Sequence, residues 1–149
     1  MNTSSGLTLL RLTFGTVLLA HGWLKLSVFT IAGTVQFFGS LGLPPIIAYL
    51  VIFGEIAGGL ALLFGLFTRL VAWLSLPIML GSLWVHLGNG WLFSNANGGW
   101  EFPAVLVMLS IVIGLAGPGA FALDQSAWVR GLFAKDSEGH TGDSGLSNA

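Results

Sequence analysis

Long apolar stretches constrain the fold of this 149-residue chain more than any other feature of its sequence. Four of them can be traced, at about 7–27, 45–67, 70–87 and 103–123. Each approaches the roughly 20 residues that a helix needs to cross a hydrocarbon core of about 30 Å. Only 7% of the residues are charged, against roughly 25% in soluble domains, and the mean hydropathy is +0.88. The pattern predicts an all-α integral membrane four-helix bundle.

The remaining segments define the domain organisation. We expect residues 1–124 to form one transmembrane domain and residues 125–149, rich in Ser, Gly, Asp and Asn, to be a largely disordered tail. The stretch from 28 to 43 is interrupted by glycines, which favours a short interfacial or re-entrant segment between the first and second helices. The first apolar stretch lacks a basic region before it, so we interpret it as a retained helix and not a secretory signal.

Charge and cysteine content narrow the function and set an orientation. The chain has no cluster of basic residues of the kind that indicates binding to nucleic acid. The chain has no cysteine, which excludes thiol chemistry and thiolate-held clusters by its own residues. Lys25 falls on one side of the membrane and the other basic residues on the opposite side: Arg11, Arg69, Arg130 and Lys135. The positive-inside rule then predicts a multi-pass protein with both termini in the cytoplasm.

The second helix carries a carboxylate, Glu55, halfway along an apolar segment and between closely spaced glycines. The spacing Gly54-x-x-x-Gly58, with Gly59 alongside, is typical of a face on which membrane helices pack closely. An isolated ionised carboxylate in this position is costly, so Glu55 is either protonated and bonded to a neighbouring helix or paired with a cation. Acids within membrane helices usually mark sites, which makes Glu55 a candidate site residue.

His21 and Lys25 are candidate partners for this acid, because they lie four residues apart on one face of the first helix. A purely structural alternative has Lys25 at the end of the span and His21 bonded to a backbone carbonyl. We expect Glu55 to face the first helix at the level of this pair, giving a proton- or ligand-binding cluster of Glu55, His21 and Lys25. Arg11 is either an interfacial anchor whose side chain reaches the headgroups or a residue that meets a partner inside the bundle.

The loop after the third helix combines turn-forming residues with aromatics that favour the membrane interface. It is predicted to lie as a lid over the polar cluster, in the outer half of the bundle. Glu101 has a structural alternative as a cap for the fourth helix. The candidate rim residues for a bound cofactor are His86, Asn89, Trp91, Trp100 and Glu101. No metal site is assigned, because the histidines lack the i, i+4 spacing of a helical ligand pair. A site that combines His21 or His86 with Glu55 or Glu101 remains an alternative.

The order and spacing of several short motifs resemble the DoxX family of small bacterial membrane proteins, over roughly residues 7–124. The matching pieces are Arg11, His21-Gly22-x-x-Lys25, Phe38-x-x-x-Gly42-x-Pro44, Gly54-Glu55-x-x-Gly58-Gly59, Gly65-x-x-Thr68-Arg69, His86, Gly99-x-Glu101, Gly117-Pro118-Gly119 and Leu123-Asp124. The resemblance implies a four-helix protein of the bacterial inner membrane. It also implies an association with redox systems, including quinone-linked ones, without assigning an activity to this chain.

Three functions remain open. The first is a redox-associated membrane subunit that binds a quinone-type ligand, with Glu55 exchanging a proton and His21 or Lys25 bonding a carbonyl oxygen. It would be an oxidoreductase subunit without a self-sufficient catalytic motif. The second is a non-catalytic anchor or assembly partner for an extracytoplasmic protein. The third is a small-solute or proton pathway, which would require a homo-oligomer. The expected partners are the lipid bilayer and a redox enzyme or extracytoplasmic protein, with a second copy of the chain for the third function.

Overall fold

The computed structural model describes residues 3–125, and within them it contains helices and turns but no strand. Five α-helices follow in order: α1 (Thr3–Ser27), α2 (Thr30–Ser40), α3 (Pro45–Phe64), α4 (Thr68–His86) and α5 (Glu101–Ala116). Short 3-10 helices, η1 (Leu87–Asn89) and η2 (Leu123–Gln125), follow α4 and α5. The predicted all-α bundle is confirmed, and the interrupted stretch between the first two long helices forms α2.

Local sequence explains where the helices begin and end. Pro45 occupies the first turn of α3, and Gly65 ends that helix in the left-handed conformation with φ 69°. The prediction that the last helix reaches residue 123 was wrong, because α5 ends at Ala116. Gly117 takes a φ of 92°, and Pro118 follows it and has no amide hydrogen to continue the helix. The predicted tail from residue 126 onward, with Arg130 and Lys135, lies outside the described residues.

Three helices are long and apolar enough to cross a membrane, at Thr3–Ser27, Pro45–Phe64 and Thr68–Asn89. The α5 helix is equally apolar but has only 16 residues. At about 1.5 Å of rise per residue it is about 24 Å long, which is shorter than a hydrocarbon core of about 30 Å.

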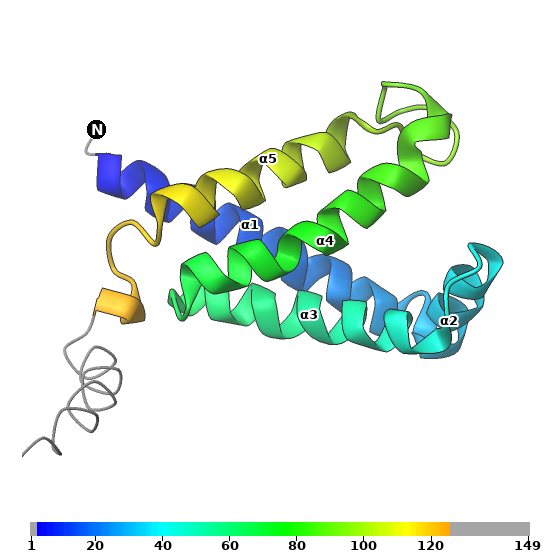
Figure 1. Cartoon of the computed structure of the whole chain (residues 1–149), viewed down its shortest axis with the longest axis horizontal. Helices are drawn as coiled ribbons and strands as arrows, with labels where there is room; N and C mark the ends of the chain where they lie inside the picture. The colour runs from blue at the N-terminus through cyan, green and yellow to red at the C-terminus, as the bar shows by residue number, and fades with distance from the viewer. Residues whose placement is uncertain (1–2, 126–149) are drawn as a thin grey trace, which may run out of the picture.

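The long helices form two antiparallel pairs, α1 with α3 and α4 with α5 (Figure 1). The pairs lie close together at the end that holds the α3–α4 turn, which we call the turn end. They diverge toward the opposite end, which we call the loop end, where α2 extends from the first pair and the α4–α5 loop extends from the second (Figure 1). This divergence is the feature of the fold that positions the candidate site.

Glycines set the close approach of α1 to α3. A side chain at Gly59 would place its Cβ 2.7 Å from the backbone nitrogen of Leu19 and 2.8 Å from the carbonyl oxygen of Gly15. The predicted glycines thus pack closely against other helices, but they face two different neighbours. Gly54 and Gly58 lie against Ile78 and Val71 of α4, whereas Gly59 lies against α1. The absence of side chains lets α3 pack tightly on both sides.

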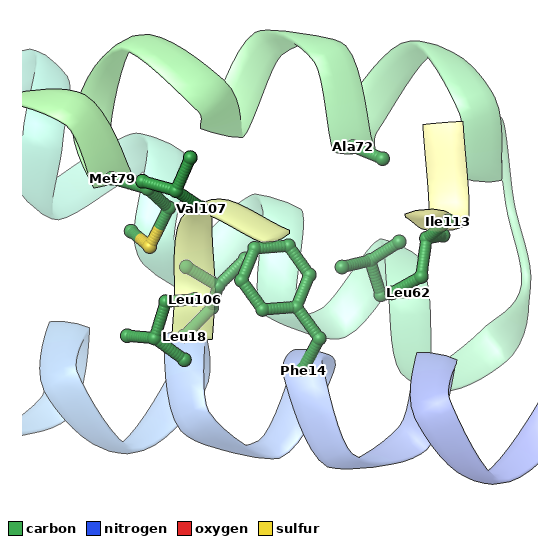
Figure 2. Packing of buried hydrophobic residues seen from close by; sticks show 8 residues of the cluster. All are labelled: Phe14, Leu18, Leu62, Ala72, Met79, Leu106, Val107 and Ile113. Carbon is green, nitrogen blue, oxygen red and sulfur yellow. The ribbon is translucent and has the colours of Figure 1, made fainter. Parts of the chain in front are cut away.

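The apolar core lies where the two pairs meet (Figure 2). Phe14 and Leu18 of α1 project toward the other helices and are completely or almost completely buried. The remaining members of the cluster come from α3, α4 and α5: Leu62, Ala72, Met79, Leu106, Val107 and Ile113. The buried Ser110 hydroxyl of α5 donates to the Ala72 carbonyl of α4 at 2.6 Å, which joins the helices of the second pair.

Candidate functional site

An ion pair between α1 and α3 lies at the centre of the candidate site. The Lys25 ammonium donates to both carboxylate oxygens of Glu55, each at 2.8 Å. The side chain of Glu55 is only 5% exposed and that of Lys25 18%. Of the states that the sequence left open for Glu55, the structure has the pairing with a cation. Gly22, three residues before Lys25, packs against Glu55 and Ile56 and lets the two backbones approach at this level.

His21 lies one turn before Lys25 on the same helix and also lines the site. Its Nδ1 is 2.8 Å from the carbonyl oxygen of Val17, so the backbone hydrogen bond of the structural alternative is present. The ring stacks on Phe102 of α5, with centroids 6.2 Å apart and planes at 23°. His21 therefore contacts both helix pairs while it remains beside the Lys25–Glu55 pair.

A cavity of about 1280 Å³ fills the space between the diverging helix pairs. We call it the interhelical cavity. Its walls are mainly aliphatic and aromatic, and they come from all five α-helices and from the α4–α5 loop. Six of the predicted site residues line it: His21, Lys25, Glu55, His86, Trp91 and Glu101. Asn89 and Trp100 are not among its lining residues.

The two predicted rim residues outside the lining instead shape the α4–α5 loop. Asn89 donates through its amide to the carbonyl oxygens of Asn97 and Gly98, at 3.1 and 2.9 Å. Trp100 packs edge to face on Trp91, with ring centroids 4.4 Å apart. These contacts fold the loop back on itself at the mouth of the cavity and hold Trp91 in place.

Glu101 stabilises the same loop from its base. Its Oε1 accepts a hydrogen bond from the backbone amide of Phe93 at 2.8 Å. Its own amide donates to the carbonyl oxygen of Trp91 at 3.1 Å. The carboxylate thus bonds a loop amide, whereas the structural alternative had it capping α5. It also lines the interhelical cavity.

His86 lies at the end of α4 and is held in the same way as His21. Its Nδ1 is 2.8 Å from the carbonyl oxygen of Ser82, four residues earlier. A Cβ placed on Gly98 would be 3.7 Å from Nε2 of the imidazole, so the loop backbone passes close to this edge of the ring. His86 therefore connects the second helix pair to the loop at the cavity wall.

Arg11 lies at the turn end, away from the interhelical cavity, and it is not an exposed anchor. The residue is 1% exposed, so the alternative of a partner inside the bundle is the one that the structure has. Its Nη2 donates to the Phe121 carbonyl at 3.5 Å, and Asp124 interacts with it electrostatically. Arg11 lies inside because the segment after α5 folds back over it: Ala120 donates through its backbone amide to the carbonyl of Ser4.

Sequence reasoning missed the role of Asp124 and the contribution of α2. The Asp124 carboxylate accepts hydrogen bonds from the amides of Phe67 and Thr68, at 2.6 and 2.8 Å, and so caps the start of α4. The sequence offered one signal for this role: Phe67, the residue before Thr68, has no side chain that can cap α4, so the cap must come from elsewhere in the chain. Thr34, Phe37 and Phe38 of α2 line the interhelical cavity, although this segment was expected only as an interfacial or re-entrant segment and not as part of the site. No group of three or more His, Asp or Glu side chains within residues 3–125 is arranged to hold a metal ion.

Comparison with known proteins identifies the family. The DoxX family model matches residues 6–88. "Putative oxidoreductase CatD" of Bacillus subtilis (strain 168) is 36% identical over 119 residues, which cover 80% of this chain and 84% of that protein. "Inner membrane protein YqjF" of Escherichia coli (strain K12) is 29% identical over 122 residues, or 80% and 90% of the two chains. No solved structure matches the chain. The chain belongs to the DoxX family.

Proposed function

We propose that this DoxX-family protein is a redox-associated subunit of the bacterial inner membrane that binds a quinone-type ligand in the interhelical cavity. The observation that carries the proposal is the composition of that cavity. A mainly apolar space of about 1280 Å³ contains one buried ion pair, Lys25–Glu55, and the polar side chains of His21, His86 and Glu101 on its walls. Ligand sites typically combine apolar walls with a few polar groups that fix orientation.

The size and the aromatic walls of the cavity suit a flat ring with an apolar tail. Its volume exceeds the roughly 300–1000 Å³ of common ligand pockets. Phe102 and Phe93 pack edge to face along one wall, with ring centroids 6.0 Å apart, and Phe102 continues the stack to His21. An aromatic ring inserted beside them gains dispersion and offset-stacking energy. The name of the Bacillus subtilis relative supports redox chemistry in the family.

The Lys25–Glu55 pair supplies the proton exchange in this proposal. Protonation of the Glu55 carboxylate would leave the Lys25 ammonium without its counter-charge, so the exchange is coupled to a ligand oxygen that takes the place of the carboxylate beside the ammonium. Reduction of a quinone to the hydroquinone takes up two electrons and two protons. In this proposal a partner redox enzyme exchanges the two electrons, and the two protons pass through Glu55 one at a time. Lys25 has a third ammonium hydrogen that is placed to donate to an oxygen of the ring, and His21 lines the cavity beside it.

The proposed orientation puts the loop end in the outer half of the membrane and both termini in the cytoplasm. It rests on the basic residues Arg11 and Arg69 at the turn end and on Lys25 near the loop end. Residues 1–124 then form the transmembrane domain, and residues 125–149 form the cytoplasmic tail. The multi-pass arrangement follows from the same placement.

The test combines ligand extraction with electron-transfer measurements. The protein is purified from its host membrane in native nanodiscs, and the lipid extract is analysed for quinones by mass spectrometry. We expect close to one quinone per chain in the wild type and at least a tenfold loss of electron transfer in host membranes of Glu55→Gln, since proton-transfer groups contribute about 10²–10⁴-fold. Leu74→Ala, on an exposed face of α4, is the control. A quinone-free wild type together with an unchanged Glu55→Gln variant contradicts the proposal.

A second function, as a membrane anchor for an extracytoplasmic protein, is favoured by the exposed apolar loop. Trp91, Leu92 and Phe93 are 51%, 55% and 62% exposed. In this case, Leu92→Ser abolishes recovery of the partner protein after crosslinking in membranes. Glu55→Gln should then lower the yield of folded protein or the amount of partner recovered. The partner itself, supplied in soluble form, should keep its intrinsic activity.

A further inference from the structure

The two histidines of the interhelical cavity are fixed in the same tautomer by their own helices. Each Nδ1 lies 2.8 Å from the carbonyl oxygen four residues earlier, Val17 for His21 and Ser82 for His86. A carbonyl oxygen can only accept a hydrogen bond, so Nδ1 carries the proton in both rings. The nitrogen left for a ligand is Nε2, which in the neutral ring offers a lone pair and no hydrogen.

The two imidazoles line the cavity from opposite helix pairs. His21 belongs to α1 and stacks on Phe102, whereas His86 ends α4 beside the loop at Gly98. Both line the cavity. A ligand that spans the cavity therefore meets one imidazole acceptor on each side.

The strongest donor in the cavity is already engaged. The Lys25 ammonium donates to both oxygens of Glu55, at 2.8 Å each, which uses two of its three hydrogens. Glu101 is also an acceptor, and its Oε1 receives the Phe93 amide. Among the histidines and charged side chains of the lining, more acceptors than donors thus remain for a ligand, whereas the indole N–H groups of Trp84 and Trp91 are donors on the same walls.

We propose that the cavity selects the reduced, dihydroxylated form of the quinone-type ligand, with one hydroxyl donating to Nε2 of His21 and the other to Nε2 of His86. This inference rests on the proposed function. A hydroxyl hydrogen matches the lone pair of each imidazole, whereas a quinone carbonyl sets one lone pair against another. Sites built to hydrogen-bond a hydroxyl discriminate strongly against analogues that lack it.

The experiment compares three ligands that share one ring and one short alkyl tail. Dissociation constants for the hydroquinone, the quinone and the dimethyl ether of the hydroquinone are measured by tryptophan quenching. The full chain is in nanodiscs under anaerobic conditions at pH 8. We expect the hydroquinone to bind at least tenfold more tightly than the other two. His21→Phe and His86→Phe should each lower the affinity for hydroquinone at least threefold and leave the affinity for quinone within twofold. His140→Phe, outside the described residues, is the matched histidine control.

The outcomes separate this inference from the proposed function. If hydroquinone and quinone bind equally, or the quinone binds more tightly, the inference is overturned and the proposed function stands. If none of the three binds, both are overturned. The comparison with the dimethyl ether needs only the wild-type chain, so a variant that does not fold leaves the test intact. A dimethyl ether that binds as tightly as the hydroquinone shows that the hydroxyl hydrogens are not recognised and overturns the inference.

Discussion

Replacing Lys25 with Met tests whether the ion pair holds α1 against α3. The substitution keeps an unbranched side chain but removes the ammonium that lies 2.8 Å from both oxygens of Glu55. The carboxylate then remains inside the bundle, 5% exposed, without its cation. Gly22 and Ile56 pack closely beside it and leave little room for reorganisation, so the carboxyl group must take up a proton to lose its charge.

The expected loss of stability is about 3 kcal/mol. Removing one partner of a buried ion pair costs about 3–5 kcal/mol. The lower end applies here, because Lys25 is 18% exposed and the unfolded state in a membrane also finds partners for its polar groups. A loss of about 3 kcal/mol changes the folding equilibrium by roughly 100-fold. Glu55→Met should cost less, about 1–2 kcal/mol, since the longer and more exposed Lys25 can move its charge toward the headgroups.

Reversible unfolding by SDS in bicelles, followed by tryptophan fluorescence, measures these differences. The double variant Lys25→Met with Glu55→Met should return to within about 1 kcal/mol of the wild type, because replacing both members of a buried pair by apolar side chains is often neutral. The double-mutant cycle formed by these three variants and the wild type should therefore give a large favourable coupling energy between Lys25 and Glu55. A loss below about 1 kcal/mol for Lys25→Met, or a double variant as unstable as the sum of the singles, would refute the reasoning.

Three further predictions concern packing and capping, each measured by the same unfolding assay. Gly59→Ala should cost at least about 2 kcal/mol, since its Cβ would lie 2.7 Å from α1 backbone. Gly81→Ala, with nothing within 4 Å, should be neutral or slightly stabilising, and equal effects would contradict the packing argument. Asp124→Ala should cost about 1–2 kcal/mol by removing the cap of α4, and no change would show that the cap is not needed. Ser110→Ala should cost about 1 kcal/mol, because it breaks the buried bond to Ala72; a gain in stability would contradict this.

The helices could be predicted from the sequence because their signals are local. Apolar runs of sufficient length mark spans, and Pro45 and Gly65 mark the two ends of α3. The same local view placed the end of the last helix too far along, because the residues after Gly117 are still partly apolar. Composition gave the apolar character of that stretch, but the left-handed glycine followed by Pro118 decides where the helix stops.

The candidate site could be predicted only as far as residue type and helical spacing reach. The spacing of His21 and Lys25 gave their shared face, and the cost of a lone buried acid required a partner for Glu55. Contacts that join distant segments left no such pattern. Asp124 caps a helix that begins 56 residues earlier, and the fold-back of Ala120 onto Ser4 encloses Arg11. The position of Arg11 near the start of its helix gave no sign that a later segment would fold back and bury it.

The glycines and the charges of the α1–α3 interface are two parts of one arrangement. A Cβ on Gly22 would be 2.6 Å from Ile56 and 3.1 Å from the Cβ of Glu55, so any side chain there would push the helices apart. Because the backbones meet at this point, Lys25, one turn further on, reaches both oxygens of Glu55. His86, in contrast, comes from the α4–α5 pair, which diverges from α1 and α3 at the loop end. The ion pair thus belongs to the tightly packed side of the cavity and His86 to the other side, and a ligand that contacts both must bridge the two helix pairs.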